Sequence, residues 1–190
     1  MRCLSLLIAV LVLAAGPVVA GPFEDAGIAA ARQDYATALR LWRPLAASGN
    51  SDAQVSLGMM YLKGQGVAKD DQQAVFWFRK AAEQGNASAQ HNLGVAYDFG
   101  HAVPKNDQLA LTWYRKAAEQ GVSIAQFNLG VMYAKGRGVD KNEQQAYFWF
   151  LLASVGGDPE AIRNRELAET RVTPQQRAAT QVDASNWKPK

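Results

Sequence analysis

Three residues near the middle of the chain have types and a spacing that metal binding could use. His91 and Asp98 are two turns apart on an expected helix, and His101 follows in a loop, so a zinc site can be drawn from them. The other interpretation is that the two histidines are solvated surface residues of a repeat. We favour the second interpretation because the ligand spacing is not close, and we expect no metal and no other cofactor.

A second set, Ser185 and Lys188, matches the S-x-x-K spacing of the nucleophile in serine penicillin-recognising enzymes. The match stands near the end of the chain, and the S-D-N and K-T-G motifs that accompany it in those enzymes do not occur. We therefore expect no catalytic residues and no enzyme. A hydrolase acting on the cell wall or on β-lactams remains the alternative.

Charge and composition narrow the class of partner. The 190 residues include 20 Lys and Arg against 17 Asp and Glu, a formal charge of +3, and no basic run is longer than a pair. Nucleic acid would require a concentrated basic face, so we do not expect it to bind.

Residues 1–20 have the three-part pattern of a secretory signal peptide. Arg2 precedes an apolar run from Leu4 to Ala15, and small residues lead up to Ala20, after which we expect cleavage. The run is too short for a permanent membrane anchor, so we expect no membrane span after cleavage and a periplasmic or secreted protein. Cys3, the single cysteine, lies in this leader, so the mature chain would have no thiol for a disulfide or a nucleophile.

The elements that must position any site are repeated at a step of 36 residues. The step relates leucine-glycine pairs, tyrosines, alanines, tryptophans and glycines: Leu57, Leu93 and Leu129; Gly58, Gly94 and Gly130; Tyr61, Tyr97 and Tyr133; Ala74, Ala110 and Ala146; Trp77, Trp113 and Trp149; Gly85, Gly121 and Gly157. A fixed period of this length is typical of stacked repeats.

Each repeat contains two expected helices. Apolar residues four apart predict a first helix, helix A, near 51–63, 87–99 and 123–135. A broader apolar stripe predicts a second, helix B, near 71–84, 107–120 and 143–156. Its large aromatic residues are interpreted as core residues rather than as a ligand-binding stack. Since one hairpin cannot bury both stripes, we predict an all-α solenoid of helix-turn-helix repeats.

The repeating residues resemble a known family. The pattern A-Q-x-x-L-G-x-x-Y, then G-x-G-V, an aspartate and A-x-x-W-[FY]-R-K-A-A-E-Q-G, is similar to the Sel-one-like repeat, a relative of the tetratricopeptide repeat, over about 51–157. The resemblance implies α/α hairpins stacked into a right-handed superhelix. It also implies an adaptor or scaffold in protein complexes, exported bacterial examples included.

The expected organisation is a signal peptide at 1–20, a degenerate helical hairpin at 21–50, repeats at 51–86, 87–122 and 123–158, and capping helices at 159–190. Leu151 and Leu152 replace the Arg-Lys pair of the other repeats, so this helix B should pack against the C-terminal segment. We expect the last helix to lie over the end of the stack. Ala102 replaces a loop glycine and must tolerate a positive φ or change the turn.

Helix A conventionally lines the concave side of such stacks, and there we expect a mostly apolar partner-binding strip. It consists of Val55, Met59, His91, Val95, Asp98, Phe127 and Val131, flanked by Gln54, Gln90 and Gln126. Packing between repeats is the alternative for some helix A residues, above all Met60 and Met132. The sequence thus predicts an exported monomeric adaptor that binds a protein or peptide. Regulation of an envelope or host protein is one version of this predicted role.

Overall fold

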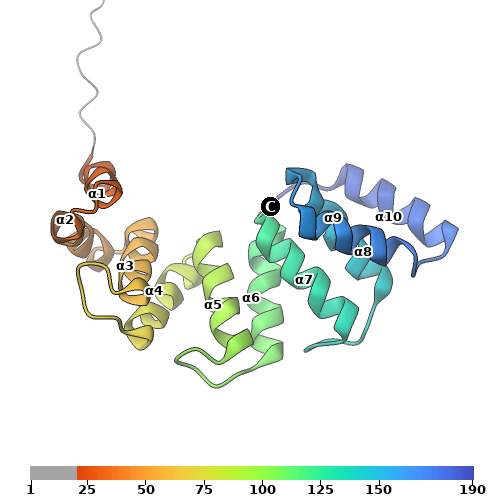
Figure 1. Cartoon of the computed structure of the whole chain (residues 1–190), viewed down its shortest axis with the longest axis horizontal. Helices are drawn as coiled ribbons and strands as arrows, with labels where there is room; N and C mark the ends of the chain where they lie inside the picture. The colour runs from red at the N-terminus through yellow and green to blue at the C-terminus, as the bar shows by residue number, and fades with distance from the viewer. Residues whose placement is uncertain (1–20) are drawn as a thin grey trace, which may run out of the picture.

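A computed structural model describes residues 21–190, and the expected signal peptide lies outside them. The helical hairpins follow one another in chain order along the long axis of the molecule, and the last two helices lie beside the final hairpin (Figure 1). The described part is all-α: α1 (Pro22–Ala31), α2 (Tyr35–Ala47), α3 (Ser51–Lys63), α4 (Asp71–Glu83), α5 (Ala87–Phe99), α6 (Asp107–Glu119), α7 (Ser123–Lys135), α8 (Glu143–Ala153), the 3₁₀ turn η1 (Ser154–Gly156), α9 (Pro159–Glu169) and α10 (Pro174–Asn186). Within residues 21–190 no helix combines the length and the apolar character that crossing a membrane requires.

Polar residues and glycines at fixed places in the repeat set the helix boundaries. The carboxamide of Asn50 accepts a hydrogen bond from the backbone amide of Ala53 and begins α3, and Asn86 begins α5 in the same way. The first helix of each repeat ends at a left-handed glycine, as α3 does at Gly64 with φ of 66°. The predicted solenoid with its 36-residue period is confirmed.

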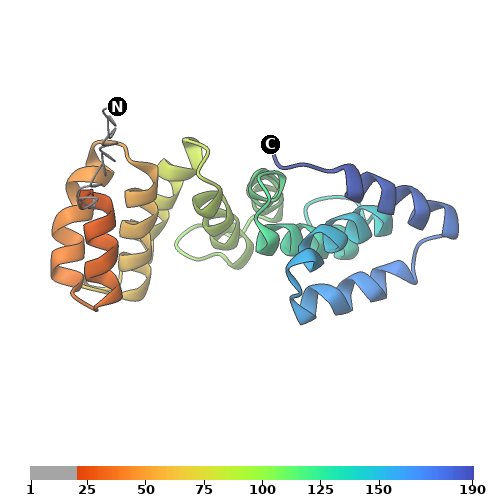
Figure 2. The same ribbon diagram turned by 90° about the horizontal axis from the view of Figure 1, so that it is seen from above.

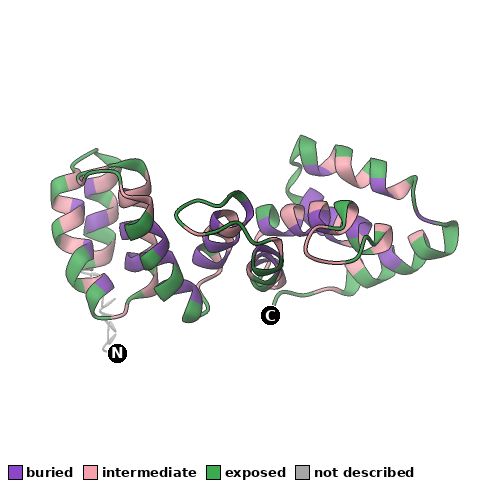
Figure 3. Cartoon of the chain, turned by 90° about the horizontal axis from the view of Figure 1, so that it is seen from below, coloured by how far each residue is buried: buried purple, intermediate pink, exposed green. Residues whose placement is uncertain are grey.

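Close contact between the two helices of a repeat explains the leucine-glycine pairs. A Cβ atom at Gly94 would lie 2.6 Å from Cδ1 of Tyr114, and Gly58 and Gly130 receive rings of α4 and α8 in the same way. Phe78 and Tyr114 are buried, and the buried residues follow the seams between helices (Figure 3). The interpretation of the B-helix aromatics as core residues is confirmed for these two and for Trp149, while Trp77 and Trp113 are half-buried against core clusters. It is wrong for Phe76, which is 46% exposed.

Three buried glutamines join consecutive repeats. The side-chain amides of Gln54, Gln90 and Gln126 donate to the backbone carbonyls of Ala46, Ala82 and Ala118 at 3.0, 3.3 and 3.2 Å. The expectation that these glutamines flank an exposed strip is wrong, because each is buried and its side-chain amide donates to a carbonyl of the preceding helix. Met60 and Met132 are buried as well, which confirms the packing interpretation for these two.

Helix α10 leaves the repeat pattern. It packs against α8, and the tail behind it runs back to α6, where the Lys190 ammonium lies 2.9 Å from the Glu119 carboxylate (Figure 2). Trp187 packs against the core cluster that contains Leu152, so the prediction that this helix B packs against the C-terminal segment is confirmed. α10 lies at the end of the molecule away from α1 and covers one side of α8, the last helix of the three repeats (Figure 1).

Candidate partner-binding site

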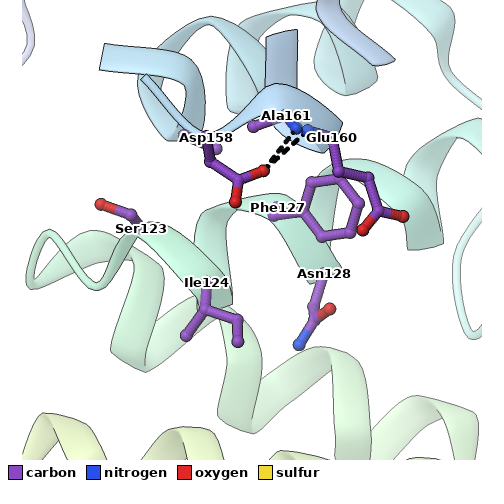
Figure 4. A pocket seen from close by; sticks show the side chains of 8 residues that line it. Ser123, Ile124, Phe127, Asn128, Asp158, Glu160 and Ala161 are labelled. Carbon is purple, nitrogen blue, oxygen red and sulfur yellow. Dashed lines mark hydrogen bonds between the residues drawn. The ribbon is translucent and has the colours of Figure 1, made fainter. Parts of the chain in front are cut away.

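A groove of about 330 Å³ lies between the N-terminal turns of α7 and α9 (Figure 4). Side chains from α7 form one wall, and the start of α9 forms the other, with its acidic residues facing the opening. The lining residues are Ser123, Ile124, Phe127, Asn128, Ala153, Asp158, Glu160 and Ala161. We call this the α7–α9 groove.

A polar link found earlier in the chain is missing at the α7–α9 groove. Between α3 and α5, the carboxamide of Asn86 donates to the carboxylate of Asp52 at 2.8 Å and ties the two helix starts together. Two repeats later, Asp158 and Ile124 occupy these positions. A carboxylate has no N–H to donate and an isoleucine has no acceptor, so this hydrogen bond cannot form between α7 and α9.

The chemistry of the α7–α9 groove is an apolar wall beside acid. Ile124 is 57% exposed, and Phe127 is half-buried with its ring centroid 5.7 Å from that of Phe150. One oxygen of Asp158 accepts hydrogen bonds from the amides of Glu160 and Ala161, which begins α9, while Glu160 is exposed. Such a surface matches an apolar side chain next to a basic group.

The predicted strip is only partly open. Phe127 lines the α7–α9 groove. Val55, Val95 and Val131 are half-buried and pack against core clusters between repeats. Met59 is half-buried as well. The strip therefore offers ligands less surface than its sequence pattern suggests.

Asp98 is not a surface residue, and the expectation that it lies on an exposed strip is wrong. It is 9% exposed, its carboxylate receives the guanidinium of Arg137, and the Tyr114 hydroxyl donates to it at 3.3 Å. Arg137 also reaches Asp107 at 2.6 Å. Its hydrogen bond holds the pKa of Asp107 below the usual range. Burial, together with the charge of Asp98, raises the pKa of the Tyr114 hydroxyl.

The two histidines have separate environments. His91 is half-buried, its ring centroid lies 5.8 Å from that of Tyr114, and burial lowers its pKa below 6.5. His101 is exposed and stacks on Phe99. Because Asp98 is paired with Arg137, the three residues of the drawn zinc site do not come together. Across residues 21–190, no three His, Cys, Asp or Glu side chains gather closely enough to hold a metal ion.

The S-x-x-K match has an ordinary structural role. Ser185 lies in the last turn of α10, where its hydroxyl donates to the carbonyl oxygen of Val182 at 2.8 Å. Lys188 is exposed in the tail that follows the helix. No observation favours these residues as a nucleophile and its base.

Ile124, Asp158 and Glu160 were missed by reasoning from the apolar stripe of helix A. A signal for Ile124 was present, because the positions 72 and 36 residues earlier hold the polar Asp52 and Ser88. The two acids belong to α9, outside the three clear repeats. Comparing each position across the repeats, rather than along one helix, would have found the isoleucine.

Comparisons with known proteins agree with the helix pattern. The Sel1 repeat model matches residues 25–50, 51–86, 87–122 and 123–158. A Sel1 repeat protein from Oxalobacter formigenes is 33% identical, with a TM-score of 0.76 over 86% of this chain and 69% of that one. The protein c5321, a protective antigen of uropathogenic Escherichia coli with an SLR fold, is also 33% identical, with a TM-score of 0.61.

The second likeness covers 87% of this chain but only 44% of c5321, so this chain spans less than half of that protein. No curated protein matches the chain. The family model covers more than half of the residues, and its repeats coincide with the stacked hairpins of the structure. The chain belongs to the Sel1 repeat family.

Proposed function

We propose that this chain is an exported, non-enzymatic adaptor that binds a protein partner through the α7–α9 groove, on the helix A face of the stack. Sel1 repeat proteins are generally scaffolds for protein interaction. The leader at residues 1–20 supports export, and the partner would then be an envelope or host protein. The chain would act as a monomer with a preformed surface, so little ordering would oppose binding.

The observation that carries the proposal is Ile124. It is a large aliphatic side chain with 57% of its surface exposed, beside the half-buried Phe127. The repeats at 51–86 and 87–122 have a polar residue at the same position. An exposed apolar group in a concave, acid-rimmed site is typical of a protein contact. A partner segment with an apolar residue next to a lysine or arginine would satisfy both the wall and the rim.

Site-specific photocrosslinking in the native host tests this assignment. A photoreactive amino acid is placed at position 124 and, as the matched control, at position 28, where Ile28 is also exposed (47%) but lies on α1. We expect a protein adduct from position 124 and none of the same mass from position 28. Equal adducts from both positions, or none from position 124, would contradict the proposal.

A further inference from the structure

A second cavity, of about 220 Å³, lies between the repeats 51–86 and 87–122. We call the contact between these two repeats the first joint, and the contact between repeats 87–122 and 123–158 the second joint. The cavity in the first joint is lined by Leu62, Asp71, Ala74, Val75, Phe78, Asn92, Val95, Ala96 and His101. Its wall is therefore mostly apolar, with one carboxylate.

The second joint shows what would fill this space. At the position of Ala96 it has Met132, which is 1% exposed in the core between α6 and α7. At the position of His101 it has Arg137, whose guanidinium lies 2.6 Å from Asp107. The second joint thus contains an aliphatic chain and a guanidinium where the first joint has Ala96 and an imidazole.

The first joint keeps one of the two acids that bind Arg137 and lacks the arginine, since Leu62 stands at the position of Asp98. Asp71 occupies the position of Asp107, and its Oδ1 atom is buried and accepts no hydrogen bond from residues 21–190. The Lys69 ammonium lies 3.5 Å away, but Lys105 lies 3.9 Å from Asp107 in the same manner and Arg137 still binds there. A lysine at this place therefore does not prevent binding of a guanidinium.

We propose that the first joint binds an arginine side chain of a protein partner. The methylene groups of the arginine pack on Val95 and Ala96 and occupy the space that Met132 fills in the second joint. The guanidinium pairs with Asp71, as Arg137 pairs with Asp107. Charge complementarity selects the cation, and the apolar wall selects a long stem. An arginine fits better than a lysine because its planar fork matches a carboxylate. The inference rests on the proposed function, since the occupant is part of a protein partner.

The test is an NMR titration of ¹⁵N-labelled protein, purified after expression of the full chain, with the peptide acetyl-Gly-Arg-Gly-amide. The control peptide carries citrulline, which has nearly the same shape as arginine but no charge. We expect saturable shifts of the Asp71, Val95 and His101 amides with the arginine peptide and binding at least about tenfold weaker with citrulline. Equal binding of the two peptides would overturn the proposal. So would chemical-shift changes that are confined to amides outside the first joint.

Two variants that copy the second joint keep the test valid. Ala96→Met fills the cavity with the residue found at positions 60 and 132, and His101→Arg supplies the chain's own guanidinium. Both should abolish the shifts while amides distant from the joint keep their positions, which shows that the fold is intact. Unchanged titration of both variants would overturn the site. Ile124→Asp, which places a charge in the apolar wall of the α7–α9 groove, should leave this titration unchanged, so the two proposals fail separately.

Discussion

The first and second joints are built by the same helix pairs, yet one is open and the other is filled. Leu62, Ala96, His101 and Ala102 of the first joint stand where the second has Asp98, Met132, Arg137 and Gly138. Residues that recur in every repeat fix how the helices approach, as the glycine beneath each B-helix ring does. The residues that vary decide whether the space between repeats holds the chain's own side chains or a ligand.

The largest expected effect comes from breaking the ion pairs of the second joint. Arg137→Met should lower the free energy of unfolding by about 3 kcal/mol, because it leaves the buried Asp98 carboxylate without its cation. His101→Met, the same change in the first joint, should alter it by less than about 0.5 kcal/mol. Urea unfolding of both variants measures the difference. Equal losses would show that the two joints do not differ as described.

The loop glycine provides the next contrast. A Cβ at Gly138, where φ is 67°, would lie 2.5 Å from the carbonyl oxygen of Asp107, so Gly138→Ala should cost about 2 kcal/mol. Ala102 keeps the same turn with a φ of 56°, so it tolerates the positive φ, one of the two outcomes expected from the sequence, at a cost in backbone strain. Ala102→Gly should therefore gain about 0.5 kcal/mol. Thermal unfolding compares them, and a loss from Ala102→Gly would contradict the strain.

Filling the first joint should have a smaller effect of opposite sign. Ala96→Met is expected to raise the free energy of unfolding by about 1 kcal/mol, because its methylenes and sulfur occupy an existing cavity. Urea unfolding measures the gain. The matched control is Met132→Ala in the second joint, which should lose stability by about 2 kcal/mol. A loss of stability from Ala96→Met would mean that the cavity does not accept this side chain.

The smallest expected effect is a pH dependence of the second joint. Because Arg137 lowers the pKa of Asp107 below 3.8, this carboxylate contributes stability that is fully present above pH 3.8 and is lost as the pH falls through the lowered pKa. The loss of stability between pH 5 and pH 2.5 should thus be smaller in Asp107→Asn than in the unmodified chain. The urea midpoint at several pH values reports it, and identical pH profiles would contradict the assignment.

The sequence predicted those parts of the fold that repeat. Residues that recur every 36 positions indicate packing positions shared by the repeats. The helices, the aromatic core and the termination of the stack could therefore be expected from the pattern alone. Asp98 could not be placed in this way, because its partner Arg137 is 39 residues away and has no equivalent in the other repeats. The side of α8 that α10 covers was also out of reach, since this helix has no register with the stack. The α7–α9 groove is lined partly by α9, which lies outside the three clear repeats, so the apolar stripe of helix A does not predict it.

The most direct test of the account measures the affinity of the purified partner, once photocrosslinking has identified it, for three purified forms of the chain. These forms are the unmodified chain, Ile124→Asp and Ile28→Asp. Ile124→Asp should weaken binding by at least about tenfold, because it places a charge in the apolar wall of the α7–α9 groove. Ile28→Asp, the same substitution at an exposed isoleucine of α1, should leave the affinity within about twofold of the unmodified chain. If the two variants bind equally well, the α7–α9 groove is not the site of partner binding.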